Sequence, residues 1–222
     1  MANYAIDKKI LSPYLPAGTE IDEWNGRCYV SLIGFMFLET TILGIKVPLH
    51  VNFEEVNLRF YVRYNDQGTW KRGVVFLKEI VPRFALTFIA NTIYGEKYET
   101  LPMQHEWQEK ENLLHVTYRW KKERWNAFQV ITTNKSKPID IGSEEEFITE
   151  HYWGYTRLSQ TKTSEYQVAH PRWEVYETKA YTIDVDFEKI YGVDFGFLTS
   201  EKPASVFLAE GSEIEVKAGG KI

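Results

Sequence analysis

The sequence is poor in cysteine, with Cys28 as the only one among 222 residues. A single thiol excludes a disulfide within the chain, and free thiols are typical of reducing compartments, so we expect a cytoplasmic location. No apolar run approaches the ~20 residues that a helix needs to cross a bilayer. Residues 1–9 also lack the pattern of a signal peptide. The sequence therefore predicts a protein without a membrane partner.

An excess of basic charge is missing as well. The chain has 26 lysines and arginines against 31 aspartates and glutamates, which gives a formal net charge of -5. The two signs are interspersed, with no basic arm or tail. Because a phosphate backbone attracts positively charged surfaces, we expect no nucleic-acid partner. A small-molecule ligand remains as the expected partner, and a homo-oligomer is an alternative because aromatic-rich strand edges need covering.

Motifs for metals, nucleotides and covalent catalysis are also absent. The 5 histidines are scattered, without the close spacing of a metal-ligand pair. There is no Gly-x-Gly-x-x-Gly, no P-loop and no Gly-x-Ser-x-Gly. The acidic run at 144–146 follows Ser143, and a helix N-terminus explains it better than a metal site does. We expect no cofactor and no metal, and hydride transfer, NTP hydrolysis and serine hydrolysis have little support.

What the chain has in abundance is aromatic residues, at 15% of the composition. They favour β structure and sizeable pockets. Alternating apolar residues predict about ten strands. Helix patterns lie at 83–95, 143–152 and 186–192, with a short helix after Asp7. We therefore predict an α+β fold in a single domain over residues 1–222. It would be a mostly antiparallel β-barrel, closed or nearly closed, with two to three peripheral helices.

The most informative segment is residues 52–64, where apolar and polar residues alternate as on a strand. The even positions from Val56 to Val62 are all apolar, whereas Glu55, Asn57 and Arg59 occupy odd positions. Two interpretations remain open for the polar face. It is either an exposed sheet face with incidental charges, or a polar strip that lines the inside of a barrel or cleft.

A second segment, residues 147–157, combines aromatic and polar side chains. Tyrosines and tryptophans with polar neighbours suit a pocket wall, because they exclude water yet can orient a ligand. The alternative is that the aromatic residues fill the core while Glu150, His151 and Arg157 bind backbone groups. Both interpretations stay open, and a structural role is favoured for His170, which precedes a proline.

A family resemblance rests on six ordered segments that span nearly the whole chain. They are Pro13-Tyr-Leu-Pro-Ala-Gly18, Trp24-Asn-Gly-Arg27, Asn52-Phe-Glu-Glu-Val-Asn-Leu-Arg-Phe-Tyr-Val62, Gly73-Val-Val-Phe-Leu-Lys-Glu-Ile-Val-Pro-Arg83, Glu150-His-Tyr-Trp-Gly-Tyr-Thr156 and His170-Pro-Arg-Trp173. Together they resemble the YqjF-like family of uncharacterised bacterial proteins, which is grouped by fold with acetoacetate decarboxylase. The resemblance implies a β-rich barrel with a central cavity, with the odd-numbered face of residues 52–64 pointing into it. It also implies that the first strand is shortened, since relatives usually begin further upstream.

The resemblance to the decarboxylase also has consequences for catalysis. That enzyme forms a Schiff base through one of two adjacent lysines that follow a tyrosine and a proline. The corresponding segment here is Tyr94-Gly95-Glu96-Lys97, which places Glu96 at the Schiff-base position and keeps only the neighbouring lysine, Lys97. A shift of one residue would place Lys97 there instead, but neither placement gives a lysine pair. The arginine that holds the substrate carboxylate would fall near Ala5, whereas the cavity glutamate corresponds to Glu55. The resemblance thus implies a retained carboxylate and a replaced nucleophile.

Three functions follow as alternatives. In the first, a polar or anionic, organic-acid-like ligand binds in the barrel, and Glu55 acts as an acid or a base. The ligand would be held by Asn57, Arg59, Glu96, His151, Tyr152 and Tyr155. In the second, the protein is a Schiff-base β-keto-acid decarboxylase that uses Lys97. In the third, it is a non-enzymatic ligand sensor or oligomeric scaffold. An ion pair between Glu55 and Arg59 would make the strip structural.

Overall fold

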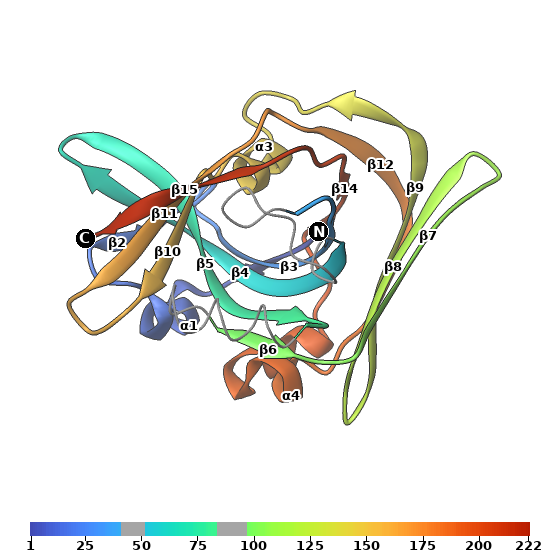
Figure 1. The fold of residues 1–222 in the computed structure, drawn as a ribbon, viewed down its shortest axis with the longest axis horizontal. Helices are drawn as coiled ribbons and strands as arrows, with labels where there is room; N and C mark the ends of the chain where they lie inside the picture. The colour runs from blue at the N-terminus through green and yellow to red at the C-terminus, as the bar shows by residue number, and fades with distance from the viewer. Residues whose placement is uncertain (41–51, 84–96) are drawn as a thin grey trace.

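The computed structural model describes residues 1–40, 52–83 and 97–222, and these form two β-sheets with short helices around them (Figure 1). In chain order the strands are β1 Ala2–Ile6, β2 Thr19–Ile21, β3 Cys28–Phe37, β4 Phe53–Asp66, β5 Thr69–Val81, β6 Tyr98–Thr100, β7 Met103–Lys110, β8 Leu113–Lys122, β9 Arg124–Pro138, β10 Trp153–Arg157, β11 Thr163–Ala169, β12 Glu174–Asp184, β13 Ser205–Val206, β14 Leu208–Ala209 and β15 Glu215–Lys221. Within the described ranges, the first sheet runs β13-β1-β3-β4-β5-β10-β11-β15, with β2 beside β4 and β6 beside β5. The second sheet runs β14-β12-β9-β8-β7.

The predicted closed barrel is wrong, because the two sheets are open and separate. In the described part of the chain, no ladder joins an end of one sheet to an end of the other. The first sheet is also mixed, since β5 pairs in parallel with both β6 and β10. The physical reason is the path of the chain, which leaves the first sheet after β6 to build β7, β8 and β9. When it returns as β10 it lies beside β5 in the same direction. The strand-rich α+β fold with few helices is confirmed.

The helices begin where the sequence places capping residues. Helix α1, Lys8–Leu11, is capped by Asp7, whose side chain accepts from the Lys9 N–H. Helix α3, Glu144–Thr149, is capped by Ser143, and helix α4, Phe187–Tyr191, by Asp186. Two 3-10 helices, η1 at Ser12–Tyr14 and η3 at Val193–Thr199, follow α1 and α4. The helix predicted over 83–95 lies almost entirely outside the described residues.

Strand β4 separates two buried layers. Its even-numbered residues Val56, Leu58, Phe60 and Val62 are fully buried and belong to the larger apolar cluster, which also contains Trp120 of β8 and Phe187 of α4. Its odd-numbered Tyr61 belongs to a smaller cluster with Tyr29 of β3 and Phe147 of α3. The ring centroids of Tyr61 and Phe147 are 5.4 Å apart. Helix α3 therefore covers the odd-numbered face of β4, as Figure 1 shows above the central strands.

Candidate functional site

The odd-numbered face of β4 is polar and buried. Glu55 and Asn57 are each 1% exposed, which is unusual for a carboxylate and an amide on one strand. Arg59 is half-buried, and Tyr61 is 1% exposed. Of the two interpretations of the alternating pattern, the face washed by solvent is thereby excluded. The face is instead a polar strip, which we define as Glu55, Asn57, Arg59 and Tyr61.

At the Glu55 end of the polar strip, two buried carboxylates, Glu55 and Glu79, lie on the same face of the sheet. Asn57 Nδ2 donates to Glu55 Oε1 at 2.9 Å, and the Tyr98 hydroxyl donates to Glu55 Oε2 at 3.2 Å. Glu79 on β5 is paired with Asn57 in the sheet register and is 2% exposed. Burial raises the pKa of the Tyr98 phenol well above its usual range, and the nearby charges of Glu55 and Glu79 add to this effect. Tyr98 therefore stays protonated and can act as a donor between the two acids.

Glu79 reaches this face because of a β-bulge. The register of β5 against β4 shifts between Leu58 and Arg59, so that Phe76 lies opposite Arg59 and Lys78 opposite Leu58. The extra residue, Leu77, reverses which positions of β5 share the face of the strip. Strict alternation from Val74 and Phe76 would have placed Glu79 on the opposite face. No pattern in the sequence marks the bulge, and sequence reasoning therefore missed Glu79. It also missed Tyr98 of β6, which lies beside Glu79 through pairing between two strands.

At the other end of the polar strip, Arg59 and His151 both pack against the ring of Tyr61. The Arg59 Cζ atom lies 5.8 Å from the centroid of the Tyr61 ring. The His151 ring, which follows α3, lies 4.7 Å from the Tyr61 ring and 5.1 Å from that of Phe147. The structure thus brings Glu55, Asn57, Arg59 and His151 to one side of the first sheet.

His151 is held by a hydrogen-bonded cluster with Asp22, which is buried, and Arg72, which is partly exposed. His151 Nε2 lies 3.1 Å from Asp22 Oδ2, and Arg72 Nε donates to the same oxygen at 2.6 Å. Burial lowers the pKa of His151 to about 4, and the positive charges of Arg72 and Arg59 lower it further. Asp22 raises this pKa but does not offset the other effects. Although burial favours the neutral acid, the hydrogen bonds from His151 and Arg72 lower the pKa of Asp22. At neutral pH the pair is therefore a neutral imidazole beside an ionised carboxylate.

A satisfied chain of hydrogen bonds adjoins the strip. The Tyr61 hydroxyl donates to Ser31 Oγ at 2.7 Å, and Ser31 donates to Asn3 Oδ1 at 2.6 Å. Asn3 Nδ2 in turn donates to Ser205 Oγ at 2.9 Å, and Ser205 donates to Glu144. This chain ties β4, β3, β1 and β13 to the first turn of α3. Its members have partners, so it explains the placement of α3 without any ligand.

Several polar atoms near the strip have no such partner. Asn57 Oδ1, Arg59 Nε and His151 Nδ1 are buried and make no hydrogen bond to any residue that the structure describes. Buried polar atoms are paired in the great majority of cases, because burying one without a partner costs about 1–3 kcal/mol. Unpaired atoms on one buried face therefore point to a group that is not part of the described chain.

Comparison with known proteins places the chain in a family. A model of the DUF2071 family, described as an uncharacterized conserved protein, matches residues 1–213. This chain belongs to the DUF2071 family. The uncharacterized protein YqjF of Bacillus subtilis strain 168 is 26% identical to it over 182 residues, which cover 81% of this chain and 72% of YqjF. The predicted resemblance to the YqjF-like family is thereby confirmed.

The DUF2071 chain shares its fold with solved acetoacetate decarboxylase-like structures. The acetoacetate decarboxylase of Legionella pneumophila matches all of this chain over 82% of its own length, with a TM-score of 0.61 and 12% identity. An acetoacetate decarboxylase-like enzyme from Sphingomonas wittichii RW1 matches all of this chain over 89% of its length, with a TM-score of 0.60 and 12% identity. The enduracididine biosynthesis enzyme MppR, complexed with pyruvate, matches 98% of this chain over 80% of its length, with a TM-score of 0.57 and 13% identity. At these identities the likeness establishes the fold.

Other residues predicted for the site lie elsewhere in this DUF2071 protein. Lys97 is exposed, and its Nζ atom lies 5.7 Å from the centroid of the Tyr14 ring. Tyr155 is 1% exposed and belongs to the larger apolar cluster, with the even-numbered residues of β4. Tyr152 is half-buried, donates to Glu150 Oε2 at 2.5 Å and lies 4.7 Å from the His170 ring. Glu96 lies outside the described residues.

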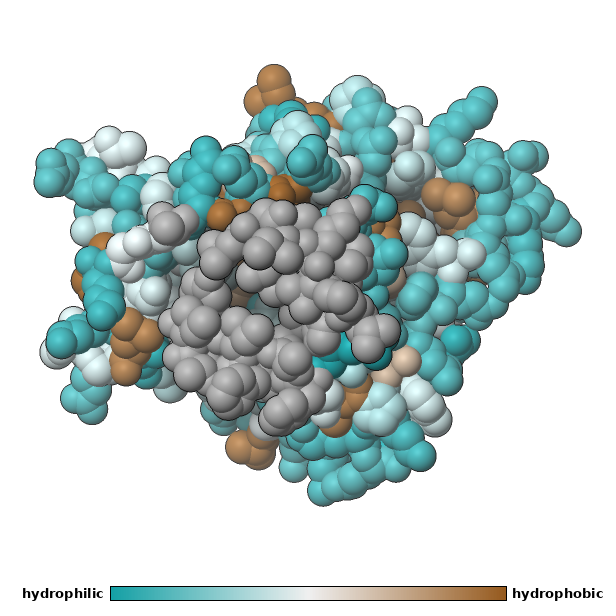
Figure 2. All heavy atoms as spheres, in the orientation of Figure 1, coloured by the Kyte–Doolittle hydropathy of each residue, from teal (hydrophilic) through white to brown (hydrophobic). Residues whose placement is uncertain are grey.

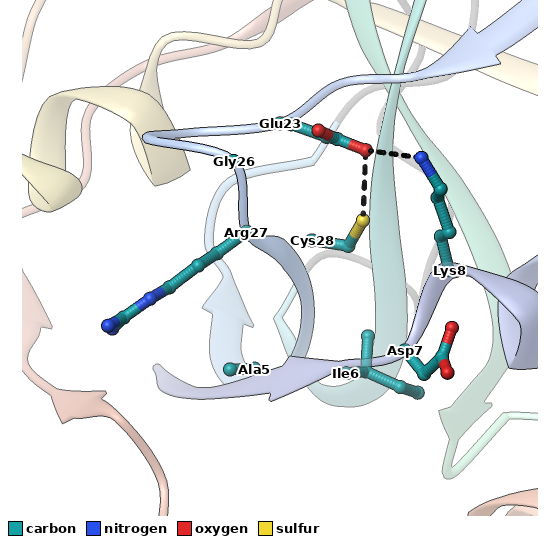
Figure 3. Close-up of a pocket in the computed structure, with 8 residues that line it drawn as sticks. All are labelled: Ala5, Ile6, Asp7, Lys8, Glu23, Gly26, Arg27 and Cys28. Carbon is teal, nitrogen blue, oxygen red and sulfur yellow. Dashed lines mark hydrogen bonds and ion pairs between the residues drawn. The ribbon is translucent and has the colours of Figure 1, made fainter.

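The surface of the DUF2071 protein carries a shallow pocket of about 450 Å³ around Cys28 (Figure 3). The Cys28 Sγ atom lies 3.6 Å from Glu23 Oε1, and the same carboxylate oxygen lies 3.5 Å from Lys8 Nζ. Burial raises the pKa of the Cys28 thiol to about 11, and the charge of Glu23 adds to this effect. A thiol that stays protonated is a poor nucleophile.

The rest of the visible surface gives little further indication of a site. Figure 2 shows mostly hydrophilic residues on this side, with apolar ones scattered between them. Over residues 1–40, 52–83 and 97–222, no group of three or more histidine, cysteine, aspartate or glutamate side chains could hold a metal ion. Among the helices in these same ranges, none combines the length and apolar character needed to cross a membrane.

Proposed function

We propose that the polar strip on β4 is a binding site for a small polar or anionic molecule of the organic-acid type. One observation carries this proposal: Asn57 Oδ1, Arg59 Nε and His151 Nδ1 are buried on one face and lack partners among the described residues. A bound molecule would supply those partners and recover their desolvation cost. Arg59 is the cation of the strip, which favours a ligand with a carboxylate.

The roles within the site follow from the chemistry of each group. Arg59 binds the anionic group of the ligand, while Asn57 and His151 accept hydrogen bonds from its other polar groups. Glu55, hydrogen-bonded to Asn57 and Tyr98, is the group that we assign as acid or base if the ligand is transformed. The fold is shared with an acetoacetate decarboxylase and with MppR complexed with pyruvate. Both names involve small organic acids, which supports this ligand class.

A Schiff-base decarboxylase that uses Lys97 has less support. Its nucleophile would need a desolvated or cation-flanked amine to lower its pKa, and Lys97 is exposed beside the ring of Tyr14. Incubation with acetoacetate and borohydride, followed by mass measurement of the peptides, tests this function. An adduct on Lys97 would establish it, and an unmodified Lys97 would exclude it.

Binding can be tested with calorimetry and thermal unfolding against a panel of small mono- and dicarboxylic acids. We expect at least one acid to bind and to raise the melting temperature, since a ligand of the folded state stabilises it. Arg59→Met should abolish this shift, and Glu55→Gln should weaken or change it.

The matched control is Arg63→Met, on the same strand. Arg63 Nε donates to Glu20 Oε1 at 2.6 Å near the surface, away from the unpaired atoms. The shift should survive in this variant. If no acid binds, or if Arg63→Met removes binding as fully as Arg59→Met does, the assigned site is wrong. The protein would then be interpreted as a scaffold.

A further inference from the structure

The residues beside the site determine which of its unpaired atoms are hydrogen-bond donors and which are acceptors. Asn57 faces Glu55 Oε1 at 2.9 Å. Because a carboxylate oxygen accepts, the amide group that faces it must be the NH₂. The other end of this amide, Oδ1, is buried without a partner in the described part of the chain. Asn57 therefore offers the site an acceptor.

The tautomer of His151 follows from the same reasoning. His151 Nε2 faces Asp22 Oδ2, and this oxygen also accepts from Arg72 Nε. The carboxylate is thus ionised, and Nε2 must carry the hydrogen of the neutral ring. Nδ1 then holds a lone pair, and it is buried with no partner among the residues that the structure describes. The aromatic rings of Tyr61 and Phe147 flank the imidazole and limit its rotation. His151 also offers an acceptor.

The site therefore has an excess of acceptors. These acceptors are Asn57 Oδ1 and His151 Nδ1. Arg59 Nε is the counterpart, an unpartnered buried donor within the described residues. A ligand that carries only acceptors would satisfy Arg59 and leave Asn57 Oδ1 and His151 Nδ1 unpaired. Sites with such unpaired polar atoms discriminate strongly against analogues that lack the matching group.

We propose that the site selects carboxylic acids that carry a hydrogen-bond donor, a hydroxyl or an ammonium group, over the corresponding oxo acids. This inference rests on the proposed function and narrows its ligand class. The carboxylate binds Arg59, and the donor binds Asn57 Oδ1 or His151 Nδ1. An oxo acid of the same skeleton has a carbonyl oxygen in place of the donor. The lone pairs of this oxygen repel the lone pairs of Asn57 Oδ1 or His151 Nδ1.

Calorimetry on the full chain with two matched sets of acids tests the selection. The first set is pyruvate, lactate and alanine, and the second is 2-oxoglutarate, 2-hydroxyglutarate and glutamate. Within each set only the group beside the carboxylate differs. We expect the hydroxy or the amino acid to bind at least about tenfold more tightly than the oxo acid. The two donor-bearing arms distinguish a hydroxyl from an ammonium ligand.

Two variants assign the preference to its residues. Asn57→Leu and His151→Phe each remove one acceptor while keeping a side chain of similar size. The preference should fall several-fold in at least one of them, whereas Arg59→Met should lose every acid alike. Because His151→Phe could perturb folding, the tautomer is also measured directly in the wild-type protein by ¹⁵N NMR. Nδ1 should be the unprotonated nitrogen of His151.

The outcomes separate the two proposals. Oxo acids that bind as tightly as their partners, or a hydrogen on Nδ1, would overturn the selection and leave the binding site in place. Failure of all six acids to bind the wild-type protein would overturn both proposals.

Discussion

Both faces of β4 are largely buried, but the side chains on them differ in polarity and in hydrogen bonding. The even-numbered face, with Val56, Leu58, Phe60 and Val62, is apolar and fully packed. The odd-numbered face holds Glu55, Asn57 and Arg59, and it keeps unpaired polar atoms out of contact with water. The apolar face gains free energy from burial at roughly 25 cal/mol per Å², whereas the polar face costs free energy until its groups are paired.

The apolar face stabilises the fold, and the difference between the faces supports our proposal that the polar face binds a ligand. Proteins carry such unfavourable burial where a ligand or a reaction requires it, and they offset its cost elsewhere. The neighbouring chain from Tyr61 to Glu144 shows that this fold can satisfy buried polar groups on the same face. The unpaired atoms of the strip are therefore not a general consequence of the architecture.

The largest expected effect comes from removing packing on the apolar face. Leu58→Ala should lower the free energy of unfolding by about 2–5 kcal/mol, because a fully buried side chain leaves a cavity in the larger cluster. Urea unfolding measures the change. Leu158→Ala is the matched control, since Leu158 is 43% exposed, and it should change stability by less than about 0.5 kcal/mol. Equal losses in both variants would contradict the assignment of stability to this face.

The pH dependence of stability tests the polar face. Burial lowers the pKa of His151 from 6.5 to about 4, so between these values the unfolded chain binds more protons than the folded one. The His151 contribution to stability should therefore rise with pH through this window and be complete above pH 6.5. The buried amino group of Met1, whose pKa is lowered from 8.0 to about 5, adds a rise that continues to about pH 8. The His151 contribution lost at the acid end is about 3 kcal/mol at 1.36 kcal/mol per pKa unit. Asp22, whose pKa is lowered below 3.8, loses its own contribution only at still lower pH.

Unfolding in urea at a series of pH values checks this expectation. His151→Phe should flatten the slope between pH 4 and 6.5. The control Leu158→Ala, which removes no titrating group, should leave the slope in place. A slope in His151→Phe as steep as that of the wild-type protein would contradict the assignment of this contribution to His151.

The smallest expected effect lies in the satisfied hydrogen-bond chain. Tyr61→Phe removes the hydroxyl that donates to Ser31 but keeps the ring contacts with Phe147 and His151. The loss in free energy of unfolding should be about 0.5–1.5 kcal/mol, the net worth of one hydrogen bond. A double-mutant cycle with Ser31→Ala isolates the coupling between the two hydroxyls. Additive effects would mean that the chain contributes no coupling energy.

Much of the local structure could be predicted from short stretches of sequence. Asp7, Ser143 and Asp186 begin helices because each cap depends only on the next few residues. Asn25 and Gly26 form the predicted turn, with positive φ angles of 50° and 73°. The alternation in residues 52–64 correctly assigned Glu55, Asn57 and Arg59 to one face of a strand. Helix α3 ends earlier than predicted, at Thr149, and β10 begins at Trp153.

The composition of the candidate site was harder to predict, because it depends on contacts between distant segments. Asp22 binds His151 across 129 positions, and neither residue carries a local signal for the other. Tyr155 was grouped with His151 because the two are close in sequence, but the turn into β10 directs Tyr155 into the larger cluster. Glu79 joins the strip only through the bulge at Leu77.

The sequence by itself determined the strands, the caps, the turns and the existence of a polar face on β4, since these depend on periodicity and on neighbours within a few residues. Only the tertiary structure decided that the sheets stay open and that the polar face is buried, with α3 packed over Tyr61. It also decided that Glu79, Tyr98, Asp22 and Arg72 lie beside this face. Strand order and register are set by pairing between segments far apart in the chain. A single extra residue in one strand is enough to exchange the side chains that share a face.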